Sequence, residues 1–279
     1  MRVHLCGVRG STPATGADFV RYGGHTSCVA LTHDGADAPS LILDTGTGVR
    51  TVTALLGEAP FTGSILYSHL HWDHFHGLPF FVAADRDDAR VAVLVPDQQD
   101  GLSAQALLER GMSPPHFPIT PSQLRGHWTF DLLAPGEHEH EGFSVLVREV
   151  PHRGGRTLGY RISDEHSALT YIPDHWPTRL GPGEDGWGSY HPAALELARD
   201  ADALIHDATL HAGELDIGKE LGHSVVDYSL ALARHAGSAT VILFHHSPTR
   251  TDDELDALAE RLAGSPEVIV ARQGAVLDL

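Results

Sequence analysis

Three histidines and an aspartate stand within six residues of one another in the segment His69-Leu70-His71-Trp72-Asp73-His74. The segment follows an apolar run, 64–68, that has the pattern of a strand. The first two histidines are two residues apart, so in an extended chain both side chains project to one side and can hold one metal ion. Asp73 and His74 follow where the chain must turn, and they can face a second metal ion nearby. The spacing predicts a metal-binding loop at the end of a strand.

The residue types indicate which chemistry such a loop supports. Two cations about 3.5–4 Å apart can hold a hydroxide and a substrate oxygen between them, which is the basis of two-metal hydrolysis. Imidazole and carboxylate ligands without thiolate suit zinc, and also iron or manganese. We therefore expect two divalent metal ions, zinc first, with manganese or iron as alternatives. The opposing interpretation is a chance cluster in a chain with 21 histidines among 279 residues.

The charge balance argues against large polyanionic partners. Lysine and arginine number 19 against 37 acidic residues, which gives a formal net charge of −18 with histidine neutral. Nucleic-acid backbones and anionic membranes are bound chiefly by lysine and arginine, so a long nucleic acid and a membrane are both unexpected partners. A small anionic molecule, which bound cations and a few local donors can neutralise, is the expected substrate.

Only two cysteines occur, Cys6 and Cys28, each flanked by apolar residues, and we expect buried free thiols rather than a disulfide framework. The N-terminus lacks the long apolar core of a signal peptide, and no run approaches the length of a transmembrane helix. A cytoplasmic enzyme is the default expectation, and a homodimer is left open.

Short apolar runs between glycine-rich turns predict many strands, and several longer segments have helical spacing. We expect strands at 3–8, 27–32, 41–43, 64–67, 90–95, 128–132, 143–150, 157–162, 168–172, 203–206, 240–244, 268–271 and 275–279, and helices at 49–56, 78–84, 102–110, 191–199, 225–235 and 252–262. This order favours two sheets packed together with helices outside. Because no clear linker interrupts the pattern, we expect one domain over residues 1–279.

Three segments fit neither pattern. Met112–Gln123 holds four prolines and is expected to pack as an irregular loop, and so is Gly181–His191; either is a candidate lid over a pocket. Glu137–Glu141 alternates glutamate and histidine, all of which are potential ligands. A solvated turn is the interpretation that we favour there over a metal site.

Further candidate ligands follow apolar strands, at the edge where a sheet presents catalytic groups to solvent. His152 could complete a three-histidine set with the first two histidines of the opening segment. Asp174 could bridge two cations with its two oxygens. His245, the first residue past its strand, is chosen over His246 as a ligand of the second metal. Taken singly, these residues could also be loop histidines or a turn cap.

In this order the residues resemble the metal-ligand series of the metallo-β-lactamase fold superfamily. The resemblance covers nearly the whole chain, including the Leu41–Gly46 strand and turn. It implies a four-layer αβ/βα sandwich with two mixed β-sheets and outer helices, and a dinuclear site between the sheets. It also implies the ligand sets: His69, His71 and His152 on one metal, Asp73, His74 and His245 on the other, and Asp174 as the bridge.

The branch of the superfamily decides the expected reaction. A β-lactamase with the best-known dinuclear site would carry a cysteine where Asp174 stands, which disfavours antibiotic hydrolysis. The segments 204–209, 222–224 and 243–247 instead resemble the ribonuclease Z-like phosphodiesterase branch. There the counterpart of His223 helps at the scissile phosphate, although the neighbour of a helix N-cap is the alternative role. The roles left open are those of Asp207, His206 and His246.

Two features favour a small substrate within that branch. Ribonuclease Z carries an extended basic arm for tRNA, and the region between Pro79 and Val150 has no such basic segment. We therefore expect a small phosphodiester, such as a cyclic nucleotide or a cyclic sugar phosphate. Arg9 and Ser11 lie in a loop that resembles the first loop of these phosphodiesterases and are candidate substrate contacts, although Arg9 could instead stabilise its own loop. Two arginines beside a candidate ligand have weaker support, Arg153 and Arg156.

The expected reaction is metal-assisted hydrolysis of a phosphodiester. A hydroxide bridging both metals, oriented by Asp73, attacks phosphorus, while protonated His223 stabilises charge or donates to the leaving oxygen. Two other functions stay open. The same metals could hydrolyse a carboxylic ester, thioester or lactone, and the protein could be a non-catalytic metal-dependent sensor that keeps the fold.

Overall fold

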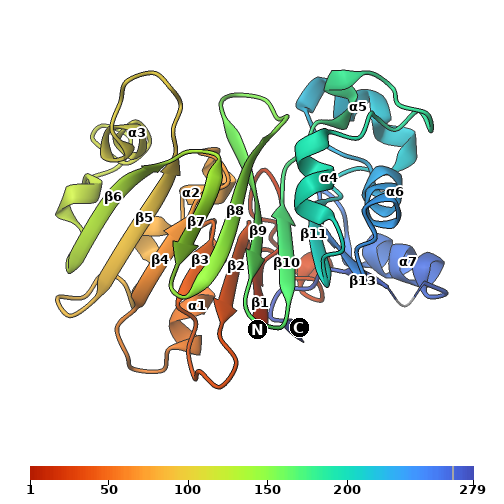
Figure 1. Ribbon diagram of the computed structural model, residues 1–279. Coiled ribbons are helices and arrows are strands. Elements are labelled where there is room, and N and C mark those ends of the chain that lie inside the picture. Colours follow the sequence, from red (N-terminus) through yellow and green to blue (C-terminus); the bar gives the residue numbers. More distant parts are fainter. Residues whose placement is uncertain (266) are drawn as a thin grey trace.

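The computed structural model describes residues 1–265 and 267–279, and within them the strands form two seven-stranded sheets (Figure 1). The first sheet contains β1 (Arg2–Gly7), β2 (Cys28–Thr32), β3 (Leu41–Leu43), β4 (Thr62–Leu66), β5 (Arg90–Pro96), β6 (His127–Leu133) and β14 (Val276–Asp278). The second contains β7 (Gly136–His140), β8 (Phe143–Val150), β9 (Thr157–Ser163), β10 (Ala168–Ile172), β11 (Ala203–Asp207), β12 (Thr240–Phe244) and β13 (Val268–Val270). Their spatial orders are β14-β1-β2-β3-β4-β5-β6 and β13-β12-β11-β10-β9-β8-β7.

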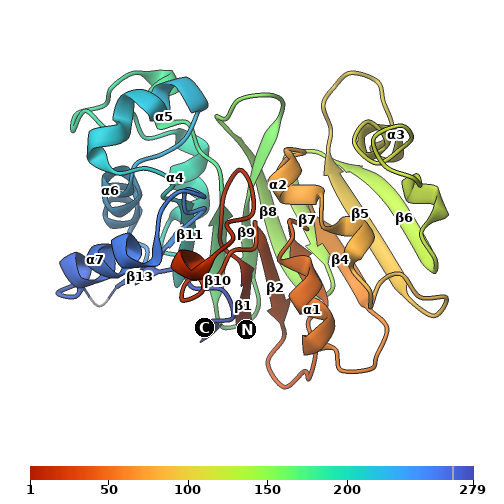
Figure 2. The ribbon, with the colours of Figure 1, turned by 180° about the vertical axis from the view of Figure 1, so that it is seen from behind.

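Most of the helices cover the outer faces of the sheets (Figure 2). They are α1 (Val49–Leu55), α2 (Trp72–Phe75), α3 (Ala104–Glu109), α4 (Pro192–Ala198), α5 (Leu215–Leu221), α6 (Val226–Ala236) and α7 (Asp252–Leu262). In the part of the chain that the structure describes, no helix is long and apolar enough to cross a membrane.

Three apolar clusters correspond to the three interfaces of a four-layer sandwich. One lies between the sheets and contains Val3, Phe143 and Ile205. A second joins the first sheet to α1 and α3, and the third joins the second sheet to α4, α6 and α7. The predicted αβ/βα sandwich is confirmed. The expectation of one domain over residues 1–279 stays a prediction.

Burial along the strands follows their place in the sheets. Every residue of β2, β3, β10 and β11 is buried, because these central strands are covered on both faces. The strands β6 and β7 stand at sheet edges, and apart from the buried Leu133 at the end of β6 their residues are exposed or half-buried. Cys6 and Cys28 are buried free thiols, as expected.

The structure corrects four local expectations. Glu137–Glu141 is not a solvated turn, because most of it forms β7, which pairs antiparallel with β8. The segment after the second histidine forms the short helix α2 rather than a loop. The helix expected at 78–84 is only a 3₁₀ turn, Leu78–Phe80, and α5 was not anticipated. The last miss has a physical reason: Gly218 disfavours a helix interior, yet its carbonyl accepts from the N–H groups of Gly222 and His223.

Two tyrosines tie the sheets together. Tyr171 in β10 donates its hydroxyl to Oδ2 of Asp44, at 2.8 Å, and Asp44 follows β3 of the opposite sheet. Tyr160 in β9 donates to the carbonyl of Tyr67, which follows β4. Burial raises the pKa of both phenols well above the usual value, so both remain neutral donors. These bonds fix the separation of the two sheets between which candidate ligands lie.

We predict that Tyr171→Phe lowers the free energy of unfolding by about 1–3 kcal/mol, because a bond to a charged carboxylate is lost while the ring still fills its space. Tyr160→Phe, which loses a bond to a neutral carbonyl, should cost about 0.5–1.5 kcal/mol and serves as the matched control. Urea denaturation with a chelator present removes any contribution from bound metal. Unchanged stability in Tyr171→Phe would contradict this role.

Candidate metal centre

The topology brings the polar strand ends together. The strands β10, β11 and β12 are parallel, so the residues that follow or end them, Asp174, Asp207 and His245, meet at one edge. The strand β8 is antiparallel to β9, which is antiparallel to β10; β8 therefore ends at this edge too and delivers His152. In the first sheet β3 and β4 are parallel, which places Asp44 beside the start of the histidine segment.

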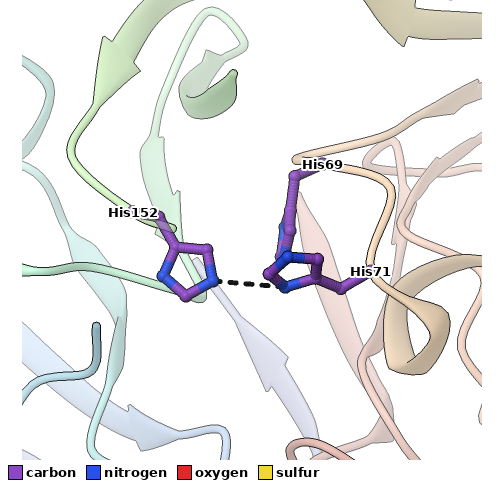
Figure 3. A group of neighbouring side chains, drawn as sticks. All are labelled: His69, His71 and His152. Atoms are coloured by element: carbon purple, nitrogen blue, oxygen red, sulfur yellow. Dashed lines mark hydrogen bonds between the residues drawn. The ribbon is translucent and has the colours of Figure 1, made fainter. Parts of the chain in front are cut away.

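The first predicted ligand set is assembled. His69, His71 and His152 each offer a ring nitrogen within 4.8 Å of the others. Figure 3 shows the loop after β4 and the loop after β8 facing each other, with Nε2 of His152 3.3 Å from Nδ1 of His71. Gly154 makes this approach possible, because a side chain there would lie 2.6 Å from Nε2 of His71.

The second predicted set is assembled beside the first. Nε2 of His74 lies 3.2 Å from Nε2 of His245, and Oδ2 of Asp73 lies 3.3 Å and 3.0 Å from these two nitrogens. The α2 turn that carries Asp73 and His74 packs on the turn after β3. Gly46 is required in that turn, because a Cβ there would lie 2.1 Å from the carbonyl oxygen of Asp73.

Asp174 stands between the two sets and is almost completely buried. Its Oδ2 lies 3.0 Å from Nε2 of His74 and 3.3 Å from Nε2 of His245, while its Oδ1 lies 3.5 Å from Nε2 of His152. Burial works against its charge, but the surrounding imidazoles, His245 and His74 first, hold the pKa of Asp174 well below its usual range. The two oxygens thus face different sets, as a bridging ligand must.

Outer hydrogen bonds fix which nitrogen each imidazole presents. Nδ1 of His74 donates to Oδ2 of Asp44 at 2.8 Å, and Nδ1 of His152 donates to the carbonyl of Gly222 at 2.8 Å. Nδ1 of His245 lies 2.9 Å from the Thr209 hydroxyl, which itself donates to Asp207 and therefore accepts from the ring. In each case Nε2 is left facing the centre, where it presents a lone pair when the ring is neutral.

His69 is oriented by a relay. The Ser68 hydroxyl donates to Oδ2 of Asp44 at 2.7 Å, so it accepts from Nδ1 of His69 at 3.0 Å. Nε2 of His69 is buried without a hydrogen-bond partner among the described residues. Burial lowers the pKa of His69 well below its usual value and that of His152 to about 4, which favours neutral rings.

The donor set fits divalent cations. Ring nitrogens of four imidazoles and oxygens of two carboxylates face one another at 3.0–3.5 Å. Burial lowers the pKa of His74, but the carboxylates, with Asp73 first, outweigh it and raise the pKa well above its usual value, so positive charge is favoured among these groups. Such acceptors repel one another unless positive charge lies among them. Nitrogen and oxygen ligands without thiolate suit zinc. The assignment of these seven residues as ligands remains a prediction.

His223 is held beside the centre by an aspartate. Its Nδ1 donates to Oδ2 of Asp207 at 3.0 Å, which leaves Nε2 as the free ring nitrogen. Burial lowers the pKa of His223, but the carboxylates, with Asp207 first, outweigh it and raise the pKa to about 9. Asp207, whose role the sequence left open, also accepts from the backbone N–H of His175, Thr209 and Ser224. It is a positioning residue for His223.

The two candidate substrate contacts differ in position. Ser11 lies at the centre, where its backbone N–H donates to Oδ2 of Asp73 at 2.6 Å. The structure does not bring Arg9 into the site: it is fully buried and donates to the carbonyls of Gly23 and Arg250. Its ion pair with Asp252 holds the loop against α7, which is the alternative role considered for it.

The remaining histidines near the centre point elsewhere. His246 donates from Nε2 to the carbonyl of Ala271, so His245 is the one of the pair that joins the centre. The ring nitrogens of His206 contact other groups: Nε2 lies 3.0 Å from Nδ1 of His175, and Nδ1 lies 2.8 Å from the Ser229 hydroxyl. No spacing signal could have identified Asp44 or Thr209, because their roles depend on pairing between distant strands.

Comparison with known proteins agrees with this geometry. The family model for the beta-lactamase superfamily domain matches residues 40–246. The chain belongs to this family. It is 22% identical to the protein named Ribonuclease Z from Gemmatimonas aurantiaca, over 91% of this chain and 90% of the relative. Solved structures share its fold as well.

The metallo-β-lactamase fold protein YhfI from Bacillus subtilis superimposes with a TM-score of 0.71 at 18% identity, covering 99% of both chains. A diphosphatase from the PhnP family gives 0.69 at 18% identity, covering 100% of this chain and 97% of the other. The resemblance drawn from the sequence is confirmed, and the protein is a hydrolase of the metallo-β-lactamase fold.

We predict that Asp44→Asn weakens metal binding about 10- to 100-fold, because the amide cannot accept every bond that orients His74 and Ser68. The change keeps the size of the side chain and touches no predicted ligand atom. Chelator competition measures the metal affinity, and His138→Ala, which removes a histidine of β7 outside the centre, is the control. Wild-type affinity in Asp44→Asn, or equal weakening in the control, would refute the orienting role.

Proposed function

We propose that this protein is a metal-dependent phosphodiesterase that acts on a small phosphodiester of the cyclic nucleotide or cyclic sugar phosphate type. One observation carries the proposal: the cluster of histidines and aspartates and the His223 side chain face the same cavity, and Asp207 holds His223 there by a hydrogen bond. This cavity has a volume of about 370 Å³, and its lining includes Ser11, Asp73, Asp174 and His223. It has room for a phosphate together with part of its substituents.

We propose two ligand sets that follow the distances. One metal ion would be held by His69, His71 and His152, and the other by Asp73, His74 and His245, with Asp174 common to both. Two divalent cations, when bound, would supply Lewis acidity and a water of lowered pKa at neutral pH. The protein's own groups orient the attacking water and protonate the leaving oxygen. Ser11 fixes the Asp73 carboxylate through its backbone N–H, so that Asp73 can orient the attacking water.

His223 supplies the proton in this scheme. Its imidazolium form carries a proton on Nε2, the nitrogen that Asp207 leaves free. As the bond between phosphorus and the leaving oxygen breaks, this proton passes to that oxygen, and the neutral ring stays hydrogen-bonded to Asp207. Asp207 thus keeps the ring in the orientation and tautomer that the transfer needs.

RNA hydrolysis is a second candidate, favoured by the likeness to a protein named Ribonuclease Z over most of both chains. A net charge of −18 and the lack of a basic arm between Pro79 and Val150 support a small substrate instead. We therefore place long RNA second.

A substrate panel tests the proposal. The metal-loaded protein is assayed with bis-p-nitrophenyl phosphate, cyclic nucleotides, precursor tRNA, lactones and thioesters. We expect turnover of the small phosphodiesters. Turnover of esters or lactones with phosphodiesters untouched would overturn the reaction class, preferential cleavage of precursor tRNA would overturn the substrate class, and no turnover of any substrate with metal bound would favour a sensor.

Two substitutions separate the proposed roles. We predict that His223→Ala lowers kcat on the best phosphodiester about 10²- to 10⁴-fold while the bound metal stays at the wild-type level, because only the proton donor is lost. Asp73→Ala should remove metal and turnover together. Rates and elemental analysis are measured on the same preparations, and full activity in His223→Ala would show that the assigned role is wrong.

A further inference from the structure

A second cavity, of about 230 Å³, lies on the His71 side of the centre. It shares Leu70, His71 and Trp72 with the cavity over the candidate ligands, so the two adjoin. Three arginines contribute to its lining, and no aspartate or glutamate does among the described residues. In a chain with 37 acidic residues against 19 basic ones, such a lining is a local reversal of the overall charge. We call it the arginine pocket.

The guanidinium groups of Arg110, Arg153 and Arg156 differ in how many of their N–H donors already have a partner. Arg156 uses Nε on Glu149 at 2.7 Å and Nη1 on the carbonyl of Asp97 at 2.9 Å, which fixes its orientation. Arg110 stands 3.6 Å from Asp100 and is exposed. Arg153 donates to no group in residues 1–265 and 267–279; it lies over the ring of Trp176, at 5.6 Å. Arg153 therefore has donors to spare for an incoming group.

The loop between β8 and β9 carries Arg153 and Arg156, and it packs closely against its neighbours. Gly155 faces Gln98, whose side chain accepts from the Arg156 N–H and donates to the Arg156 carbonyl. A Cβ on Gly222 would lie 2.6 Å from Cγ of Arg153, so the arginine side chain packs directly against the residue before His223. The loop is therefore held by Gln98 on one side and packs against Gly222, next to His223, on the other.

We propose that the arginine pocket is a second anion subsite, in which Arg153, with Arg156 and Arg110, binds a phosphate monoester that the substrate carries apart from its scissile phosphodiester. Guanidinium groups bind phosphate through charge-assisted hydrogen bonds, often in pairs. Leu70, Phe75 and Leu107 line the same cavity and offer apolar contacts to the sugar or base that joins the two phosphates. This inference rests on the proposed phosphodiesterase function and narrows its substrate class.

A matched substrate pair tests the subsite. Adenosine 2′,3′-cyclic phosphate and its 5′-phosphorylated form differ only in the second phosphate. We expect wild-type kcat/KM to be about tenfold or more higher for the phosphorylated form. Arg153→Gln should remove most of this preference through KM, while kcat/KM for the unphosphorylated form stays within about twofold. Arg179→Gln is the control, because Arg179 also lies over Trp176, at 5.5 Å, but does not line the pocket.

A binding measurement separates failure of the subsite from failure of the proposed function. Calorimetry on the metal-loaded protein compares adenosine 5′-monophosphate with adenosine, independently of turnover. Weaker binding of the monophosphate in Arg153→Gln alone supports the subsite, even if no phosphodiester is hydrolysed and the proposed reaction is lost. Equal binding by wild type, Arg153→Gln and Arg179→Gln, or no preference for the phosphorylated substrate, overturns the subsite whether or not phosphodiesters are hydrolysed.

Discussion

At the sheet edge, lone pairs of imidazole nitrogens and two carboxylates face one another at little more than 3 Å, and the rest of the structure has to hold these acceptors in place. Their mutual repulsion is relieved only by positive charge between them. The fold meets this demand through hydrogen bonds from the far side of each ring. Asp44 orients His74 directly and His69 through Ser68, and Thr209 orients His245.

The sandwich supplies the geometry that these bonds need. Asp44 belongs to the first sheet, but it also accepts from Tyr171 of the second, so one carboxylate links a predicted ligand to both layers. On the other side, Asp207 closes β11 and orients His223. The candidate centre is therefore part of the interface between the sheets, and a change in their separation would move both ligand sets.

Much of this was accessible from the sequence, because the relevant signals are local. The alternation of His69 and His71, and the placement of His152, Asp174 and His245 after apolar strands, predicted which residues would meet. What failed depended on contacts between distant segments. Arg9 reads as a flexible loop cation, yet it is drawn into a buried ion pair with Asp252, more than 240 positions away along the chain. The strand β7 forms because it pairs with β8, and its alternating glutamates and histidines give no local sign of a strand.

Anomalous X-ray diffraction from crystals of the purified protein, recorded at the zinc, iron and manganese absorption edges, tests the central claim most directly. The account predicts two anomalous peaks. One is in contact with His69, His71 and His152, the other with Asp73, His74 and His245, and each lies about 2.0–2.2 Å from an oxygen of Asp174. A single peak, or metal bound away from these residues, would contradict it.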